Sequence, residues 1–278
     1  MMVRPTALLC LCVGVALTPR GARAQELGRI ELPAMGLLDF EEATVEGWVL
    51  FEFDPAQHEE GVWRSMGGWF IFDVPRSDVD RGAGMSINVG LRNIGRHGEV
   101  QSDCGMRVGF VKDGQEVPHP VLPSCAGFGR GRWHHVAVTW REGRFLRVYF
   151  DGELSAERDF PASIVRDVPA AGRIILGWEG FLRQNLLAID EVRISSIARA
   201  PEEFGYRHCP LQPDPWTMLL ENFEQVTEVE GALLTTPAVL ATAIEPTSFP
   251  VVGGRLIDGR DGRAFAFSPQ PPQATEEE

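Results

Sequence analysis

Residues 132–152, RWHHVAVTWREGRFLRVYFDG, constrain the fold more than any other part of this 278-residue chain. Residues 133–140 are rich in aromatic and β-branched side chains, and Arg-Glu-Gly follows as a turn. Residues 145–150 then run back toward a tight Asp151-Gly152 turn. This order is typical of a β-hairpin. The segment therefore predicts two antiparallel strands, and it makes the fold easier to assign than the function.

Short apolar runs separated by Gly, Pro and Asp recur along the rest of the chain, and helical periodicity is almost absent. Such a pattern is typical of an all-β sandwich. Eight strands suffice for two packed antiparallel sheets. The predicted strands are residues 43–53, 68–73, 85–91, 106–111, 133–140, 145–150, 172–178 and 189–194.

The two histidines of the hairpin, His134 and His135, are adjacent in sequence. Side chains alternate between the two faces of a strand, so these residues point to opposite sides. They cannot both bind one metal ion from this strand. We interpret each as a sheet histidine with a hydrogen-bond partner.

The N-terminus predicts a secretory signal peptide over residues 1–24. Arg4 supplies a positive charge, residues 7–17 are an apolar run, and Ala22-Arg23-Ala24 is a small-x-small cleavage signal. The apolar run is shorter than the roughly 20 residues that span a bilayer. No other run is long enough either. We expect a protein that is secreted, periplasmic or at the cell surface, without membrane insertion.

The charge of the chain limits its partners. Removing residues 1–24 takes away three arginines and no acids, which changes the formal net charge from −13 to −16. This balance argues against nucleic acid and anionic membrane surfaces as partners. Lys112 is the only lysine, and this skew toward arginine, with abundant Ala and Gly, suggests a GC-rich bacterial genome.

Three cysteines follow the signal peptide. Cys104 and Cys125 flank one long excursion of the chain, and export implies an oxidising compartment, so these two are the predicted disulfide. Cys209 is then free or is a partner of one of the others. His119 and His208 lie near these cysteines, but no metal-ligand spacing supports a Cys/His metal site.

Composition changes after residue 204. Residues 208–216 contain three prolines and are predicted to be a linker. Two strand-like pieces follow at 218–223 and 264–267, and residues 269–278 are rich in Pro, Gln and Glu and are predicted to be disordered. We therefore expect one sandwich over residues 25–207 and a C-terminal extension over residues 208–268.

Three ordered segments resemble the laminin-G-like jelly roll of the concanavalin A-like lectin/glucanase superfamily. Residues 40–49, FEEATVEGWV, resemble its early G-T-(I/V)-E-x-W strand, and residues 133–152 resemble its W-H-H-V-A-V-T-W hairpin. Residues 189–204, IDEVRISSIARAPEEF, resemble its closing I-D-E-V-R-I strand and the A-R-x-P-E-E that follows. The resemblance covers residues 38–204 and implies a two-sheet antiparallel jelly-roll sandwich.

Two strands that usually begin such a jelly roll occur late in this chain, as LLENFE at 219–224 and GRDGRAFAF at 259–267. The tail either completes the sandwich from the other end, as in a circular permutation, or is a truncated second repeat. We favour the first hypothesis, because domain termini often lie close together and an unfinished sheet would leave apolar strand edges open.

Glucanases on this fold carry an E-x-D-x-x-E motif, whose two carboxylates lie roughly 5–5.5 Å apart for retaining hydrolysis. The nearest match here is EFDPAQ at 52–57, in which Gln57 replaces the second glutamate and Pro55 interrupts the strand. The chain contains no nucleophile elbow, zinc-protease helix motif or phosphate loop. We therefore predict no catalytic residues.

In many such jelly rolls, an aspartate at the start of the last family strand binds a structural calcium ion, and the resemblance places it at Asp190. Calcium prefers several oxygen ligands and tolerates irregular geometry. Asp39, Glu41, Glu221 and Glu224 are candidates for further ligands. The alternative is that Asp190 caps a turn or pairs with an arginine.

Carbohydrate binding on this fold would use aromatic side chains near loops, and Trp63, Trp69 and Trp178 are the candidates, although burial in the core is the competing interpretation for each. The 103–126 excursion is a second candidate recognition element. We expect the tryptophans inside alternating strands to lie in the core: Trp48, Trp133 and Trp140.

The prediction for function is a secreted, non-catalytic module that recognises carbohydrate or another extracellular or envelope protein. A glycoside hydrolase-like enzyme and a structural module of an envelope assembly are the alternatives. Fold alone does not separate them, because function resides in sites carried by folds.

Overall fold

The computed structural model describes residues 28–52, 68–73, 84–91, 104–112, 115–117, 121–124, 129–160, 172–177, 187–207, 209–230, 232–241 and 247–268. Between residues 68 and 124 it describes strands and their pairing, with the side chain of Val108 alone. The predicted signal peptide and the predicted disordered tail lie outside the described residues.

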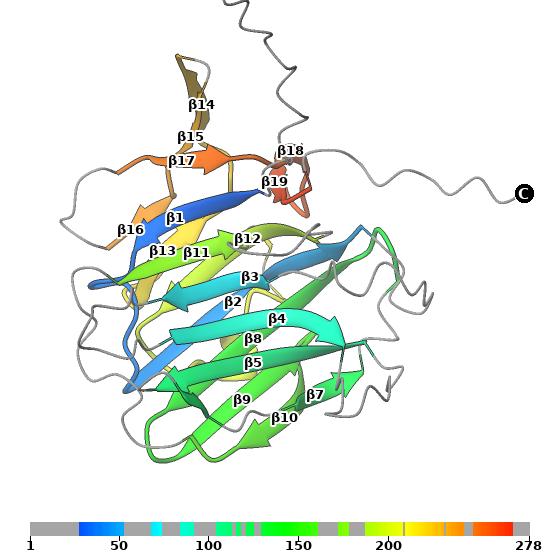
Figure 1. The fold of residues 1–278 in the computed structure, drawn as a ribbon, viewed down its shortest axis with the longest axis vertical. Helices are drawn as coiled ribbons and strands as arrows, with labels where there is room; N and C mark the ends of the chain where they lie inside the picture. The colour runs from blue at the N-terminus through cyan, green and yellow to red at the C-terminus, as the bar shows by residue number, and fades with distance from the viewer. Residues whose placement is uncertain are drawn as a thin grey trace, which may run out of the picture.

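Two antiparallel sheets, stacked face to face, make up the fold (Figure 1). The ten-stranded sheet has the order β14 (Val226–Val229), β15 (Ala232–Thr235), β17 (Phe249–Val252), β1 (Arg29–Pro33), β11 (Arg173–Gly177), β3 (Gly68–Asp73), β4 (Gly84–Leu91), β5 (Cys104–Lys112) and β6 (Gln115–Val117), with β7 (Val121–Ser124) also paired to β5. The nine-stranded sheet has the order β10 (Glu153–Arg158), β9 (Phe145–Phe150), β8 (Trp133–Arg141), β2 (Glu42–Phe51), β12 (Leu187–Ser195), β13 (Thr217–Glu221) and β16 (Val239–Leu240), with β19 (Arg263–Ala266) paired to β12 and to β18 (Arg255–Asp258).

The predicted fold class, an all-β two-sheet antiparallel sandwich, is confirmed. All eight predicted strands are present, with ends that differ from the prediction by at most two residues. The predicted hairpin is β8 and β9, which pair from Val136 opposite Phe150 to Arg141 opposite Phe145. Strand β10 was not predicted, because its sequence ELSAER is polar and its residues are exposed or half-buried at the edge of the sheet.

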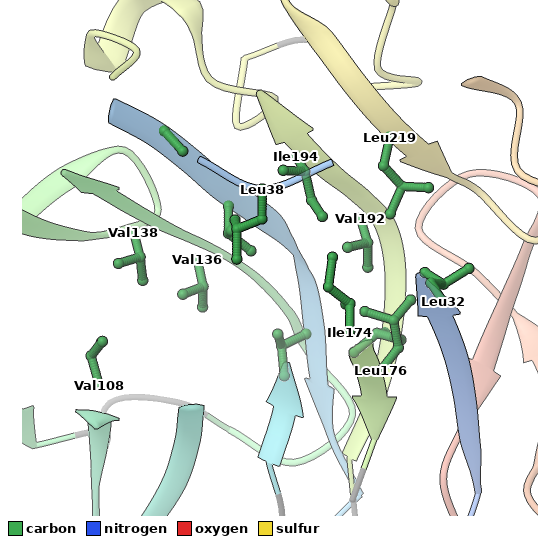
Figure 2. Close-up of a cluster of buried hydrophobic side chains, with 14 of the residues drawn as sticks. Leu32, Leu38, Val108, Val136, Val138, Ile174, Leu176, Val192, Ile194 and Leu219 are labelled. Atoms are coloured by element: carbon green, nitrogen blue, oxygen red, sulfur yellow. The ribbon is translucent and has the colours of Figure 1, made fainter. Parts of the chain in front are cut away.

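The core lies between the sheets, where apolar side chains at alternate strand positions meet (Figure 2). Each such side chain contributes roughly 1.5–3 kcal/mol when it is fully buried. The predicted core residue Trp140 has no exposed surface and packs against Phe40 and Phe160. Figure 2 labels side chains from both sheets that point toward one another, among them Val108, Ile174, Leu176, Val136, Val138, Val192 and Ile194.

Residues 217–266 contribute strands to both sheets (Figure 1). β13 and β19 pair with successive parts of β12, on the edge opposite β2, and β17 pairs with β1. Three phenylalanines from this part of the chain, Phe223, Phe265 and Phe267, belong to the inter-sheet core and have no exposed surface.

The outer face of the nine-stranded sheet is covered by the chain that follows β12. A short 3-10 helix, η2 (Pro201–Glu203), leads to Phe204, which packs on Ala137 of β8 and Tyr149 of β9. Within the described residues, no helix is long and apolar enough to cross a membrane.

Candidate functional site

A buried ionic network anchors the outer face of the nine-stranded sheet. Arg193 donates from Nε to Oε1 of Glu46 at 2.8 Å, and His135 Nε2 lies 2.9 Å from Oε2 of the same carboxylate. Burial alone would raise the pKa of Glu46, but the hydrogen bond to His135 and the charges of His135 and Arg193 hold it below its usual value. A buried carboxylate with these partners is a stable anion.

The same network fixes the segment that crosses the sheet. The Gly205 N–H donates to Glu46 Oε2 at 2.8 Å, and Arg193 Nη2 donates to the Glu203 carbonyl at 2.8 Å. The hydrogen-bonding role predicted for both histidines is confirmed, since His134 Nδ1 lies 2.9 Å from Asp151 Oδ2 on the opposite face of β8. We interpret the network as scaffold, because its oxygens are already used by protein donors.

Tyr206, which follows this segment, presents an aromatic ring to solvent. The residue is 42% exposed, and its ring centroid lies 6.3 Å from that of Trp48 and 6.2 Å from that of His135. Its edge rests on Gly152, where a Cβ atom would lie 2.7 Å from Tyr206 Cδ1 and where φ is +83°. Only glycine satisfies both conditions, so the Asp-Gly turn of the hairpin seats this ring.

Trp48 is buried as predicted, but it lies outside the inter-sheet core. It packs on the outer face against His135, with ring centroids 5.3 Å apart, and against Tyr206. Alternation explains this position, because Val45 and Val49 point into the core and Trp48 has the opposite parity. The indole Nε1 of Trp48 is buried and has no hydrogen-bond partner among the described residues.

A β-bulge next to Trp48 redirects the side chains of β12. Glu191 and Val192 together oppose the single Gly47 of β2, and Glu191 has a φ of +50°. Bulges of this kind re-aim side chains and are frequent beside functional sites. Here the Glu191 carboxylate accepts the N–H of Leu211, and Asp190 faces the C-terminal hairpin.

Asp190 caps the turn between β18 and β19. Its Oδ2 accepts the N–H of Arg260 at 2.7 Å and that of Asp261 at 3.3 Å, and its Oδ1 accepts the N–H of Glu191 at 2.8 Å. Burial raises the pKa of Asp190 to about 7, against the lowering effect of these donors. The guanidinium of Arg260 lies over the Trp48 ring, 5.0 Å from its centroid.

The described residues do not form a calcium cage around Asp190. Among them, no three His, Cys, Asp or Glu side chains converge as a metal site. Three of the four predicted co-ligands accept hydrogen bonds from protein groups: Glu221 from Thr235 and Phe223, Glu224 from the Arg263 N–H, and Asp39 from the Glu41 N–H. Calcium binding stays a prediction, and a Ca²⁺-dependent rise of the thermal midpoint would show that a site exists.

Glu52, the first residue of the incomplete carboxylate motif, lies just beyond the end of β2. It is buried in an ion pair with Arg255 of β18. Burial raises its pKa, although the charge of Arg255 opposes that effect. The other motif positions, Asp54 and Gln57, lie outside the described residues. Glu52 therefore links the family-like strands to the C-terminal extension.

Most predicted site residues lie outside the described residues or have side chains that are not described. Trp63, Trp178 and Cys125 lie outside the described residues, and Trp69 and Cys104 belong to strands whose side chains are not described. Pairing of β7 with β5 places Ser124 opposite Gly105, so the neighbours of the two predicted disulfide cysteines face each other. The disulfide stays a prediction.

Cys209 is a free, half-buried thiol. Burial and the neighbouring charge of Glu191 raise its pKa to about 11. A thiol with so high a pKa is almost entirely protonated at neutral pH and is a poor nucleophile. Cys209 is therefore no candidate for covalent chemistry.

Two stacked antiparallel sheets around a shared apolar core define a lectin-like β-sandwich. Residues 27–204 match the Laminin_G_3 family model, described as the concanavalin A-like lectin/glucanases superfamily. The chain belongs to this family. Its matched part ends at residue 204, two residues before Tyr206 and well before the β18–β19 hairpin.

Known relatives are similar over part of their length. A 151-residue stretch, 54% of this chain, is 30% identical to the mouse and 39% identical to the rat sushi, von Willebrand factor type A, EGF and pentraxin domain-containing protein 1. The chain spans about 4% of those proteins. A Bacteroides ovatus protein, provisionally described as carbohydrate binding, has a similar structure with a TM-score of 0.52 at 15% identity, over 88% of this chain and 58% of that chain. That likeness shows the fold.

Proposed function

We propose that this protein is an exported, non-catalytic carbohydrate-binding module whose ligand stacks on Tyr206. The observation that carries the proposal is the ring of Tyr206, which is 42% exposed yet fixed by contacts with Gly152, Trp48 and His135. A rigid exposed ring offers contact area at a low cost in conformational entropy. Polar groups around an aromatic surface are the usual composition of a small-ligand site.

Four further findings support this proposal. The family is one of lectins and glucanases, and the structural neighbour from Bacteroides ovatus is described as carbohydrate binding. The sequence favours binding over hydrolysis, because Gln57 occupies the position of the second carboxylate that retaining hydrolysis requires. The signal-peptide-like segment 1–24 supports export.

A glycan array tests the proposal. The chain from Gln25 onward is applied with and without Ca²⁺, as wild type and as Tyr206→Ala. We expect Tyr206→Ala to weaken binding about tenfold or more, since loss of one stacked ring costs on the order of 1.4 kcal/mol. Trp216→Ala is the matched control, because Trp216 is 52% exposed but lies beside Ser196, beyond the end of β12.

Three outcomes would contradict this assignment. Binding lost in Trp63→Ala, Trp69→Ala or Trp178→Ala but retained in Tyr206→Ala would move the site to the residues predicted from sequence. Turnover of a β-glucan would show an enzyme. No binding to any glycan would shift the assignment to a protein ligand.

A protein ligand is the second candidate function, favoured by one observation. β10 is the edge strand of the nine-stranded sheet and carries Leu154, which is 52% exposed. An exposed edge strand is a template for pairing with an extended segment of another chain. Leu154→Lys would abolish such pairing and leave glycan binding unchanged.

A further inference from the structure

We propose that the C-terminal β18–β19 hairpin supplies part of the carbohydrate site, with Arg260 and Asp261 binding neighbouring hydroxyl groups of a neutral sugar and Asp190 acting as their positioning residue. This inference rests on the proposed function, and it names a ligand class for the same site. The hairpin follows the family-matched residues, and the resemblance of residues 259–267 to a family strand assigned no binding role to its turn.

The turn of this hairpin is held from two sides. On one side, Asp190 Oδ2 accepts the N–H groups of Arg260 and Asp261. On the other side, Glu224 Oε1 accepts the Arg263 N–H at 2.6 Å, and the Glu224 carbonyl accepts a hydrogen bond from the Arg263 guanidinium. A loop fixed by two carboxylates is preorganised, which reduces the entropy that a ligand must overcome.

Glycine at the start of the turn reflects how closely Asp190 approaches. A Cβ atom at position 259 would lie 2.6 Å from Asp190 Oδ2, and the Gly259 N–H closes the turn by donating to the Gly262 carbonyl at 2.9 Å. Asp190 is therefore packed against the turn backbone. It accepts the backbone N–H groups of Arg260 and Asp261, the two turn residues that carry exposed side chains.

The turn presents a donor and an acceptor side by side. Arg260 and Asp261 are both exposed, and among the described residues neither side chain makes a hydrogen bond to another protein group. Arg260 and Tyr206 both contact the Trp48 ring. A guanidinium donates and a carboxylate accepts, whereas a hydroxyl group does both. Neighbouring hydroxyls of a sugar stacked on Tyr206 match this pair.

The local charge argues for a neutral sugar. The carboxylates of Glu191 and Glu224 lie near the turn in addition to that of Asp261, Asp190 adds only part of a charge because its pKa is about 7, and the whole chain carries a formal charge of −13. Repulsion from these groups disfavours uronates and sulfated sugars. Hydroxyl recognition does not incur that cost.

Binding to a glycan array that carries neutral oligosaccharides beside uronate-containing and sulfated ones tests the inference. We expect Arg260→Ala and Asp261→Asn each to weaken binding to the neutral oligosaccharides about tenfold, as for loss of a hydrogen bond to a charged group. Asp261→Asn should leave the thermal midpoint unchanged because its side chain is exposed, and Arg260→Ala should lower it only slightly, through loss of the contact with the Trp48 ring. Asp258→Ala is the matched control, since Asp258 is an exposed acid of the same hairpin outside the turn.

The positioning role of Asp190 is tested by a binding measurement that a purely structural role of this residue would not affect. Asp190→Ala should weaken binding in the wild-type background but add no further loss in an Arg260→Ala, Asp261→Asn background, because it acts through those two residues. Asp190→Asn should restore part of the binding, since an amide oxygen still accepts the turn N–H groups. An additive loss in the double-substitution background would overturn the positioning role.

The outcomes separate this inference from the proposed function. Loss of binding in Tyr206→Ala with wild-type binding in Arg260→Ala and Asp261→Asn would refute the hairpin and leave the carbohydrate module. A preference for uronate-containing or sulfated glycans would overturn the ligand class. No glycan binding at all would refute both.

Discussion

Glu46 and Glu221 are carboxylates without exposed surface on two strands of the same sheet, yet their surroundings differ in kind. Glu46 lies in the family-matched part of the chain and is met by Arg193 and His135. Glu221 lies in the C-terminal extension and is met only by neutral donors, the Thr235 hydroxyl and the Phe223 N–H. The pKa of Glu46 is lowered, whereas burial raises that of Glu221 to about 7.

The two regions therefore bury polar groups by different means. In the Glu46 network the carboxylate stays ionised, and the stability of the network depends on the ion pair between Glu46 and Arg193. The Glu221 contact joins β13 of one sheet to β15 of the other, and burial favours the protonated carboxyl group although its two hydrogen-bond donors favour the anion. The two regions should therefore respond differently to deletion, substitution and pH.

The largest expected effect comes from removing the extension. Deleting residues 217–268 takes Phe223, Phe265 and Phe267 out of the core. Loss of one buried phenylalanine side chain costs about 3–5 kcal/mol, so the three together approach the whole stability of a typical domain, about 5–15 kcal/mol. We expect no cooperative thermal transition in circular dichroism. Truncation after residue 268 is the control, and an unchanged midpoint in the larger deletion would show that the extension is not part of the core.

Substitution of Glu46 should have the next largest effect. Glu46→Gln leaves the buried Arg193 guanidinium without an anion, which costs about 3–5 kcal/mol. Glu42→Gln is the matched control on the same strand, because the Glu42–Arg141 pair is exposed to solvent and should contribute much less. Urea denaturation measures both. Equal losses in the two variants would mean that the Glu46 network does not stabilise the sheet.

Strand positions and faces could be predicted from sequence where the pattern is local. The hairpin was predictable because alternation and its turn residues lie within about twenty neighbouring positions, and the same alternation separated His134 from His135. The same alternation puts Trp48 on the face opposite Val45 and Val49, so our expectation that it lies in the core was wrong. Its burial on the outer face depends on Tyr206, which is far away in sequence.

The candidate site was less predictable, because its parts meet only in the folded chain. Tyr206 sits on Gly152, and Arg260 is held by Asp190, which is seventy residues earlier. No periodicity connects such positions. The available signal was the resemblance, which singled out Asp190 as a calcium ligand and left turn capping as the alternative, and the structure shows Asp190 capping the turn.

The smallest expected effect, and the sharpest test of the contrast with Glu46, is the pH dependence of Glu221. Its pKa is about 7 in the folded protein, above its usual value of 4.5, so the folded state binds the proton more tightly. Stability from this group is therefore fully present below about pH 4.5 and is lost as the pH rises through about 7. The loss is on the order of 3 kcal/mol.

Glu221→Gln keeps an acceptor for the Phe223 N–H and a donor for the Thr235 hydroxyl, but it does not titrate. We expect this variant to be more stable than wild type at pH 8 by about 1–3 kcal/mol and to show a flatter decline of stability between pH 5 and 8, measured by urea denaturation at each pH. Glu228→Gln, on the exposed neighbouring strand β14, controls for the loss of one acid. If Glu221→Gln follows the wild-type pH curve, Glu221 is ionised in the folded protein, and its surroundings stabilise the anion as those of Glu46 do.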